Sequence, residues 1–342
     1  MTQRDTGPAF VARLRRRHTA LRALRQWLWR HDFVEADTPQ LVPGPGLEPQ
    51  IDPLVVDVAL DLLHAHRERR WLITSPELAL KRVVAGGVPR VFQLGHVFRD
   101  GERTRRHHPE FTLLEWYRGP GTLDEILDDT LALIRVVAAA VGNVTAVDVD
   151  AAPDILDVAD AFSRFAGIDL GAAIDETNAG DAGALPRRAR AVGEVIVGDD
   201  VGFDDAFFHV MTTRIEPRIG RERLCVLQRW PASMAVLARV DVDDPRYARR
   251  FEIYGHSQLG CLELCNAFDE LTDAAEQRRR FEADNDLRAR LGKPRLPLDE
   301  DFLAALPSMP SPSAGNALGV DRLLMLLTDA ADIDDVTALA WR

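Results

Sequence analysis

Hydrophobic residues along the chain switch between helical and extended spacing. Between residues 8 and 30, leucines recur at helical intervals while the arginines fall mainly on other faces, which predicts an amphipathic helix. The leucines concerned are Leu14, Leu21, Leu24 and Leu28. Thr38 and Pro39 then stop regular structure, and a loop rich in proline and glycine follows. Beyond that loop, the stretches 54–60 and 71–74 are typical of strands.

The rest of the chain predicts further strands and helices with short connections. Ser75, Pro76 and Glu77 have the pattern of a helix start with Ser75 as its N-cap, and Gly86 marks the end of that helix. Further strands are expected at 91–99 and 111–118, with two more within 249–268, and further helices at 123–142, within 145–225, at 272–291 and after Gly319. Because consecutive strands meet through turns rather than helical crossovers, we expect an α+β fold with a mainly antiparallel sheet flanked by helices.

The composition narrows the class of protein. The chain has 342 residues, of which 46% are hydrophobic, so it can bury a large core. Residues 1–20 lack the apolar segment of a signal peptide, and the longest apolar run, near 131–141, is too short to span a bilayer. Three cysteines argue against a disulfide framework. These features together predict a cytoplasmic protein without a membrane partner, and a net charge of −12 argues against nonspecific nucleic-acid binding.

A basic loop in this acidic chain is the first candidate for chemistry. Arginines and histidines crowd residues 98–118, and Arg99 stands where the preceding strand-like stretch ends. A planar guanidinium held at a strand end suits bidentate binding of a phosphate. Taken alone, each arginine is more typical of a solvated surface, so this interpretation depends on the other sites.

A second candidate lies near the end of the chain, in the stretch GNALGVDRLLMLL. Gly315 and Gly319 permit close approach of the backbone to another group. Arg322 falls in the first turn of an apolar helix, where a cation opposes the helix dipole. Such a locally unfavourable residue often marks a site, although a salt bridge to Asp321 or Asp329 is the ordinary alternative.

The stretch CLELCNAFDELTD is a third candidate, because two glutamates and an asparagine stand in an otherwise apolar strand. Glu263, Asn266 and Glu270 supply the oxygen ligands that suit magnesium held together with substrate phosphates. A spacing of seven places Glu263 and Glu270 on opposite faces of a regular strand, so either a bulge intervenes or Glu270 lies beyond the strand end. Alternatively, Glu270 belongs to the acidic first turn of the next helix.

Taken in order, these stretches resemble the catalytic core of a class II aminoacyl-tRNA synthetase in its lysyl form. The stretches that carry the resemblance are ADTPQL, TSPELALKR, FRDGERTRRHHPEFTLLEWY, LELCNAFDELTDAAEQRRRFEADN and GNALGVDRLLML. The first, third and last look like the three motifs of the class, and the resemblance covers roughly residues 10–342. We expect one catalytic domain over 1–342 without an N-terminal anticodon-binding domain. This arrangement, with Ala317 where lysyl enzymes have glycine, resembles the elongation factor P (R)-β-lysine ligase family.

The resemblance implies an activity and a set of site residues. Members of that family adenylate (R)-β-lysine with ATP and transfer it to a lysine of elongation factor P, so ATP, Mg²⁺, β-lysine or lysine, and elongation factor P become the expected partners, in a homodimer. Arg99 and Arg322 would be catalytic, and Glu263 and Glu270 would bind the metal. ATP would contact Arg99, Asp100, Gly101, Glu102, His108, Glu263, Leu264, Gly319 and Arg322. The amino acid would contact Ser75, Pro76, Glu77, Tyr117, Asn266, Glu270 and Ala317.

Three positions depart from the family pattern. Gly101 stands where the second motif usually has glutamate, with Glu102 one residue later, His108 replaces an asparagine, and Ala267 replaces a glycine. Two further hypotheses therefore stay open. The chain could activate an amino acid for another carrier, or it could be an inactive paralogue that regulates a partner. Retention of Arg99, Glu263, Glu270 and Arg322 argues against the second.

Overall fold

The computed structural model describes residues 6–63, 65–198 and 201–339. Internal contacts divide the chain into two compact units. Unit 1 contains residues 1–143 and 269–342, and unit 2 contains residues 144–268. The single catalytic domain expected for residues 1–342 stays a prediction. Among the residues just defined, no helix is both long and apolar enough to cross a membrane.

The strands of unit 1 bring residues from both ends of the chain together. They run in the order β1 (Val34–Glu35), β5 (Arg90–Phe98), β6 (Glu110–Arg118) and β11 (Ala314–Gly319). The β1–β5 pair is parallel and the other two pairs are antiparallel. The register places Gln93 and Ala317 on either side of Glu115. Strand β6 therefore holds the centre of this unit, with motif residues on both sides of it.

Helices of unit 1 pack against these strands and one another. Three of them are α1 (Gly7–Arg30), α3 (Leu123–Val141) and α10 (Val320–Thr328). Helix α3 begins with a reciprocal capping box, in which Thr122 accepts from the backbone of Glu125 and the Glu125 carboxylate accepts from the backbone of Thr122. The predicted apolar face of the first helix is wrong at Leu14, which is 42% exposed, whereas Leu24 and Leu28 are fully buried.

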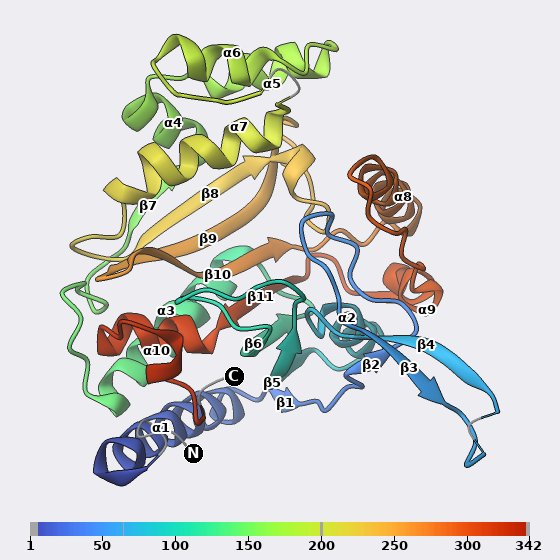
Figure 1. The fold of residues 1–342 in the computed structure, drawn as a ribbon, viewed down its shortest axis with the longest axis vertical. Coiled ribbons are helices and arrows are strands. Elements are labelled where there is room, and N and C mark those ends of the chain that lie inside the picture. The colour runs from blue at the N-terminus through green and yellow to red at the C-terminus, as the bar shows by residue number, and fades with distance from the viewer. Residues whose placement is uncertain (1–5, 64, 199–200, 340–342) are drawn as a thin grey trace. The chain divides into compact units, whose positions relative to one another are not determined.

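A second group of elements in unit 1 surrounds helix α2 (Glu77–Ala85). The small sheet has the order β2 (Leu41–Val42), β4 (Arg67–Leu72), β3 (Val55–Ala59), and Figure 1 shows the β3–β4 hairpin extending away from the other strands of this unit. Helices α8 (Ala274–Arg290) and α9 (Glu300–Ala305) pack together, and α9 also contacts α2. Two 3₁₀ turns, Leu306–Ser308 and Ile333–Asp335, complete the unit.

Two predicted boundaries in this region are wrong by a few residues. The strand expected at 71–74 is β4, which ends at Leu72; Ile73 leaves the ladder and its backbone N–H donates to Gln40 instead. The N-cap of α2 is Pro76 rather than Ser75. Ser75 nevertheless contributes to the helix start, because its hydroxyl accepts a 3.0 Å hydrogen bond from the backbone N–H of Glu77.

Unit 2 has its own strands, in the order β10 (Gly260–Asp269), β9 (Tyr247–Ser257), β8 (Cys225–Pro231) and β7 (Asp154–Asp157), with Asp269 already counted in unit 1. Only the β7–β8 pair is parallel. Helices α4 (Val158–Ala166), α5 (Leu170–Asn178), α6 (Ala184–Ala191) and α7 (Phe203–Val210) gather on one side of β7–β9 (Figure 1), followed by a π-helical turn, Met211–Ile215, and the 3₁₀ turns Glu216–Arg218 and Ala232–Met234. The helices predicted within 145–225 are thus confirmed.

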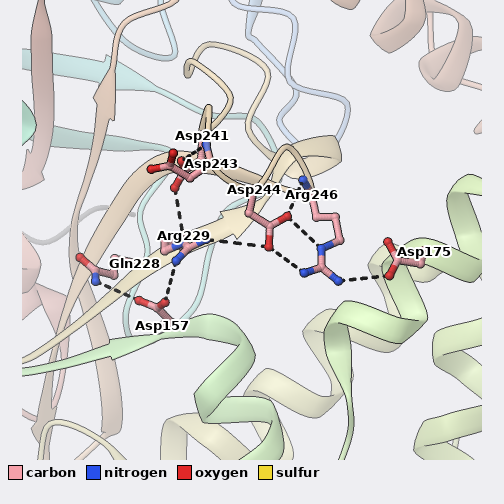
Figure 2. Close-up of polar contacts among 8 residues, drawn as sticks. All are labelled: Asp157, Asp175, Gln228, Arg229, Asp241, Asp243, Asp244 and Arg246. Atoms are coloured by element: carbon pink, nitrogen blue, oxygen red, sulfur yellow. Dashed lines mark hydrogen bonds and ion pairs between the residues drawn. The ribbon is translucent and has the colours of Figure 1, made fainter.

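Two arginines fasten the strands of unit 2 to its helices and loops (Figure 2). Arg229, in the left-handed backbone region at φ 58°, lies 3.4 Å from Asp157 and 3.5 Å from Asp241. Arg246 donates to both carboxylate oxygens of Asp244 and forms a 3.1 Å bond to Asp175 on α5. Antiparallel pairs dominate both units, so the predicted α+β class with a mainly antiparallel sheet is confirmed.

Candidate active site

Glu115 is a buried carboxylate that receives hydrogen bonds from two neighbouring side chains. The Ser75 hydroxyl donates to Oε2 at 2.7 Å and the Tyr117 hydroxyl donates to Oε1 at 2.6 Å. Burial and the charge of Glu77 raise the pKa of Glu115 to about 8, although these two hydrogen bonds and the charge of Lys81 lower it. A buried carboxylate whose two hydrogen bonds come from neutral hydroxyls is well suited to accept a cationic group from a ligand.

Lys81 stands between two other carboxylates of the same region. Its Nζ atom is 2.5 Å from Oε2 of Glu270 and also donates to Oε1 of Glu77, four residues earlier on α2. Burial lowers the pKa of Lys81, but the charges of Glu270 and Glu77 outweigh burial, so the pKa is raised and the side chain is an ammonium. Burial also raises the pKa of Glu270, to about 8, although Lys81 lowers it. We call Glu77, Lys81, Glu115, Tyr117 and Glu270 the carboxylate cluster.

Gly315 on β11 makes room for this cluster. A Cβ atom at this position would lie 2.2 Å from the Tyr117 ring and 3.0 Å from Oε1 of Glu270. The close backbone approach predicted for Gly315 is therefore confirmed, and the group that approaches is the Tyr117 ring. Ala317 is paired with Glu115 in the β11–β6 register and packs against the core cluster of Ile73, Val97 and Leu113. Its methyl group narrows the space beside Glu115 relative to glycine.

Oε1 of Glu270 lacks a hydrogen-bond donor within the described ranges, although the residue is only 1% exposed. A buried carboxylate oxygen without a donor is costly unless a ligand supplies one. The cluster therefore combines two ion pairs of Lys81, with Glu77 and Glu270, with a carboxylate oxygen that can accept an additional donor.

The turn after β5 explains one departure from the family motif. The Arg99 guanidinium lies 5.0 Å over the Phe111 ring, and its backbone N–H donates to Pro109, so both the side chain and the main chain are held by the returning strand. Gly101 has a φ of 76°, a left-handed conformation in which glutamate would be strained. The next residue, Glu102, places a carboxylate oxygen 3.8 Å from Arg99. Glu102 can therefore form an ion pair with Arg99, although it stands one residue after the position where the motif usually has glutamate.

Arg322 forms a hydrogen bond with His107, a partner that the sequence motifs did not offer. The distance from its NH2 atom to Nε2 of His107 is 2.6 Å. Burial, followed by the charges of Arg322, Arg106 and Arg99, lowers the pKa of His107 to about 4. The imidazole is therefore neutral and accepts at Nε2. Because His107 feels both Arg99 and Arg322, the two arginines that the sequence assigned to phosphate contacts act on one place in unit 1.

The other charged groups near Arg322 are occupied by different partners. Asp321 pairs with Arg17 at 2.5 Å and accepts from the backbone N–H of Thr112 at 2.7 Å. His108, predicted to contact ATP, lies 3.1 Å from Asp334. The structure thus places His107, which the sequence motifs did not single out, beside Arg322, and the ATP contact of His108 stays a prediction.

Glu263, Leu264 and Asn266 belong to unit 2, where they lie on β10. The register with β9 shifts between Glu263 and Cys265, and β10 ends at Asp269. Both alternatives offered for the seven-residue spacing therefore apply, since a bulge intervenes and Glu270 follows the strand end. Oδ1 of Asn266 accepts from Nε of Arg250 at 2.9 Å, which leaves the Nδ2 donors of Asn266 for other groups. Because Glu270 belongs to unit 1, the metal site expected at Glu263 and Glu270 stays a prediction.

Several predicted residues are thus brought together, and three important ones were missed. Contacts or register join five of the predicted substrate residues: Ser75, Glu77, Tyr117, Glu270 and Ala317. The missed residues are Lys81, Glu115 and His107. Glu115 was detectable as a lone carboxylate in an apolar strand. Lys81 was detectable because the chain has 42 lysines and arginines in total, of which only residues 81 and 293 are lysines.

Comparison with known proteins agrees with this arrangement. The sequence profile of the class II tRNA synthetases (D, K and N) matches residues 6–341. An elongation factor P–(R)-β-lysine ligase from Hamiltonella defensa is 33% identical over 329 residues, covering 96% of this chain and 94% of the relative. The ligase of that name from Edwardsiella ictaluri is 35% identical, with coverage of 96% and 95%. A third, from Salmonella paratyphi B, is 37% identical over 276 residues, which are 80% of this chain and 78% of the relative.

Proposed function

Because the chain belongs to the class II aminoacyl-tRNA synthetase family, among its elongation factor P–(R)-β-lysine ligases, we propose that it is an ATP-dependent ligase that adenylates (R)-β-lysine or lysine and transfers it to a lysine of elongation factor P. The relatives' printed name supplies the acceptor and the amino acid. The observation that carries the proposal is the carboxylate cluster, whose buried carboxyl groups can become charged partners of a substrate with two ammonium groups.

The reaction has two steps, and the chain supplies positioning and charge rather than a covalent nucleophile. In the first step, a carboxylate oxygen of the amino acid attacks the α-phosphorus of ATP and pyrophosphate leaves. Arg99 would stabilise the charge at the α-phosphate and Arg322 would bind the γ-phosphate. In the second step, the lysine amine of elongation factor P attacks the activated carbonyl and AMP leaves. When ATP binds, Arg322 would exchange its hydrogen bond to His107 for contacts with the phosphates. A guanidinium binds an anion more strongly than it binds a neutral imidazole.

Magnesium would accompany ATP in this reaction, and its chemistry would be to neutralise phosphate charge. The carboxylate oxygens of Glu263 and Glu270 are the ligand type that Mg²⁺ prefers, and Mg²⁺ takes only one or two of these from a protein when phosphates supply the rest. In unit 1, Lys81 already occupies Oε2 of Glu270, which leaves Oε1 for a further partner. Within the described residues there is no group of three or more histidines, cysteines, aspartates or glutamates that would hold a metal alone.

The proposed assembly is a homodimer that works in the cytoplasm. Helix α1, which precedes the stretch ADTPQL that looks like the first motif of the class, exposes three large apolar side chains. Val11 is 43% exposed, Leu14 is 42% exposed and Trp29 is 51% exposed. Apolar side chains left on one helix support its use as a subunit contact. A monomeric mass in sedimentation at micromolar concentration would contradict the dimer.

Isotope exchange and acceptor labelling test the proposed function directly. Purified chain with ATP and Mg²⁺ is expected to exchange labelled pyrophosphate into ATP when (R)-β-lysine or lysine is present. It is then expected to transfer the labelled amino acid to elongation factor P and leave tRNA unlabelled. Exchange without labelling of elongation factor P would favour another carrier. Absence of exchange would favour the inactive paralogue, whereas exchange that is lost in Arg322→Ala would exclude it.

A further inference from the structure

Glu48 is a carboxylate of unit 1 that none of the sequence motifs includes. It lies in the loop rich in proline and glycine between β2 and β3. A Cβ atom added at Gly46 would be 2.9 Å from Oε2 of Glu48 and 3.2 Å from the hydroxyl of Thr74. Thr74 is buried and directly precedes Ser75, whose hydroxyl donates to Glu115. The carboxylate of Glu48 is therefore close to the segment that opens α2 and begins the carboxylate cluster.

The loop that carries Glu48 is clamped by two cations from the end of α8. Arg288, only 1% exposed, donates from NH1 to the backbone carbonyls of Glu48 at 3.3 Å and Ile51 at 2.9 Å. Its NH2 atom is 3.0 Å from Asp52, and Lys293 is 2.9 Å from the other oxygen of Asp52. A fully buried guanidinium that bonds main-chain carbonyls fixes the backbone rather than merely covering it. The position of Glu48 is thus set before any substrate arrives.

The loop of Glu48 also contacts the residue after Arg99, because the backbone N–H of Asp100 donates to the carbonyl of Asp52 at 2.7 Å. Burial raises the pKa of Glu48, as does the charge of Glu77, while Arg99 and Lys81 lower it. Glu77 and Lys81 also act on the pKa of Glu115, whose hydrogen-bond donors are Tyr117 and Ser75. The Glu48 loop therefore connects the start of α2 with the turn that carries Arg99.

We propose that Glu48 binds the ammonium group nearest the carboxylate of the amino-acid substrate, while Glu115 binds the ammonium at its far end. This inference rests on the proposed function, in which Arg99 lies where the substrate carboxylate reacts. In a diamino acid such as lysine or β-lysine, one amino group is one or two carbons from the carboxylate and the other is at the chain end. Glu48, in the loop bonded to the residue after Arg99, would meet the near group, and Glu115, bonded by Tyr117, would meet the far group. Glu48 is then a specificity-determining residue for diamino acids.

The charge count supports this assignment. Four carboxyl groups, those of Glu48, Glu77, Glu115 and Glu270, interact with the ammonium of Lys81, and the charge of Arg99 would be met by substrate carboxylate or phosphate. A substrate with two ammonium groups favours the charged form of more of these carboxyl groups than a substrate with one. In the described parts of the chain, moreover, no cationic side chain forms an ion pair with Glu48. Its carboxylate is therefore available to a substrate ammonium.

The test compares Glu48→Gln with the unmodified chain for ligands that differ by one amino group. Lysine and (R)-β-lysine carry both groups, ε-aminocaproate lacks the group near the carboxylate, and norleucine lacks the terminal group. Calorimetric dissociation constants measure binding whether or not turnover occurs, and pyrophosphate exchange adds KM and kcat. Glu282→Gln, on the exposed side of α8, is the matched control, and unfolding temperatures verify that both variants fold.

Glu48→Gln is expected to weaken the binding of lysine and β-lysine by about tenfold or more, because it removes one charge-assisted hydrogen bond. The KM for ATP is expected to stay unchanged. The same substitution is expected to change ε-aminocaproate binding by less than about twofold, because that ligand has no group for Glu48 to bind. Unchanged lysine affinity, or an equal loss for ε-aminocaproate, would overturn the inference. Lysine binding without pyrophosphate exchange would instead overturn the proposed function and leave the Glu48 comparison valid. Absence of binding by every ligand would overturn both.

Discussion

The hydroxyl of Tyr117 donates a 2.6 Å hydrogen bond to Oε1 of Glu115, two residues earlier on the same strand face. Because alternate residues of a strand share a face, the pair is built into β6 and does not depend on a distant element. Burial also raises the pKa of Tyr117 well above its ordinary value, so this group is a hydrogen-bond donor at every physiological pH. Glu115 is thus held by a hydroxyl that keeps its own proton throughout this pH range.

Glu115→Gln is expected to weaken lysine binding by about tenfold to a hundredfold, because an amide cannot pair with the substrate ammonium as a carboxylate does. Tyr117→Phe removes only a neutral donor and is expected to weaken binding less than Glu115→Gln. Calorimetry on the two variants, with norleucine as the ligand that lacks the terminal ammonium, measures the difference. Equal affinity of Glu115→Gln and the unmodified chain for lysine would contradict the role of Glu115.

The pKa of Glu115 predicts that lysine binding releases a proton. In the free chain this carboxyl is largely protonated below its pKa of about 8, because burial and Glu77 disfavour its charge. A bound ammonium favours the carboxylate, so binding is expected to expel the proton and to strengthen as pH rises toward about 8. Calorimetry at neutral pH in buffers of different ionisation enthalpy counts the released protons.

Two results decide this prediction. A binding enthalpy that is the same in every buffer would mean that no proton leaves, and would contradict it. The Glu115→Gln variant serves as the control, because it has no carboxyl at this position and is expected to release fewer protons. The charged groups that also face Glu115 are Glu77, Lys81 and Glu270, and all three stay in place in that variant.

The fold was largely predictable from the sequence, whereas the site was predictable only in part. Strands at 91–99 and 111–118 and the helix after Thr122 follow from apolar spacing and capping residues, which are local properties. Lys81 acquires its role from Glu270, which is distant in the sequence, and no spacing rule connects the two. Glu48 lies in a loop without periodicity and is positioned by Arg288 from another part of the chain. Such pairings arise from tertiary packing, which local patterns do not encode.

Lys81→Met is expected to destabilise the chain by about 3–5 kcal/mol near neutral pH, because it leaves two buried carboxylates without their counter-ion. The loss should be smaller at acidic pH. A carboxyl with a raised pKa contributes stability in its protonated form, and that stability is lost as pH rises through the raised pKa, which for Glu270 is about 8. Urea unfolding at acidic and neutral pH measures both values.

The double variant Lys81→Met with Glu270→Gln controls for the specific charge effect. It removes one of the stranded carboxylates and is expected to recover part of the lost free energy of unfolding. A second comparison is Lys81→Arg, which keeps the charge but places a larger planar group in a fully buried position, and is therefore expected to destabilise by overpacking. Equal stability of Lys81→Met and the unmodified chain would show that the ion pair is dispensable.

Gly315→Ala is expected to weaken lysine binding at least as much as Tyr117→Phe does, while leaving ATP binding intact. The added Cβ atom would lie 2.2 Å from the Tyr117 ring, so the ring must move and Tyr117 would lose its hydrogen bond to Glu115. Gly315 and Tyr117 are paired in the β11–β6 register, so the ring can move only if a strand shifts. We therefore also expect a loss of stability of about 1–3 kcal/mol. The double variant Gly315→Ala with Tyr117→Leu removes the ring and is expected to recover stability but not lysine affinity. Lysine affinity that survives in Gly315→Ala would show that the Tyr117–Glu115 pair does not position the substrate.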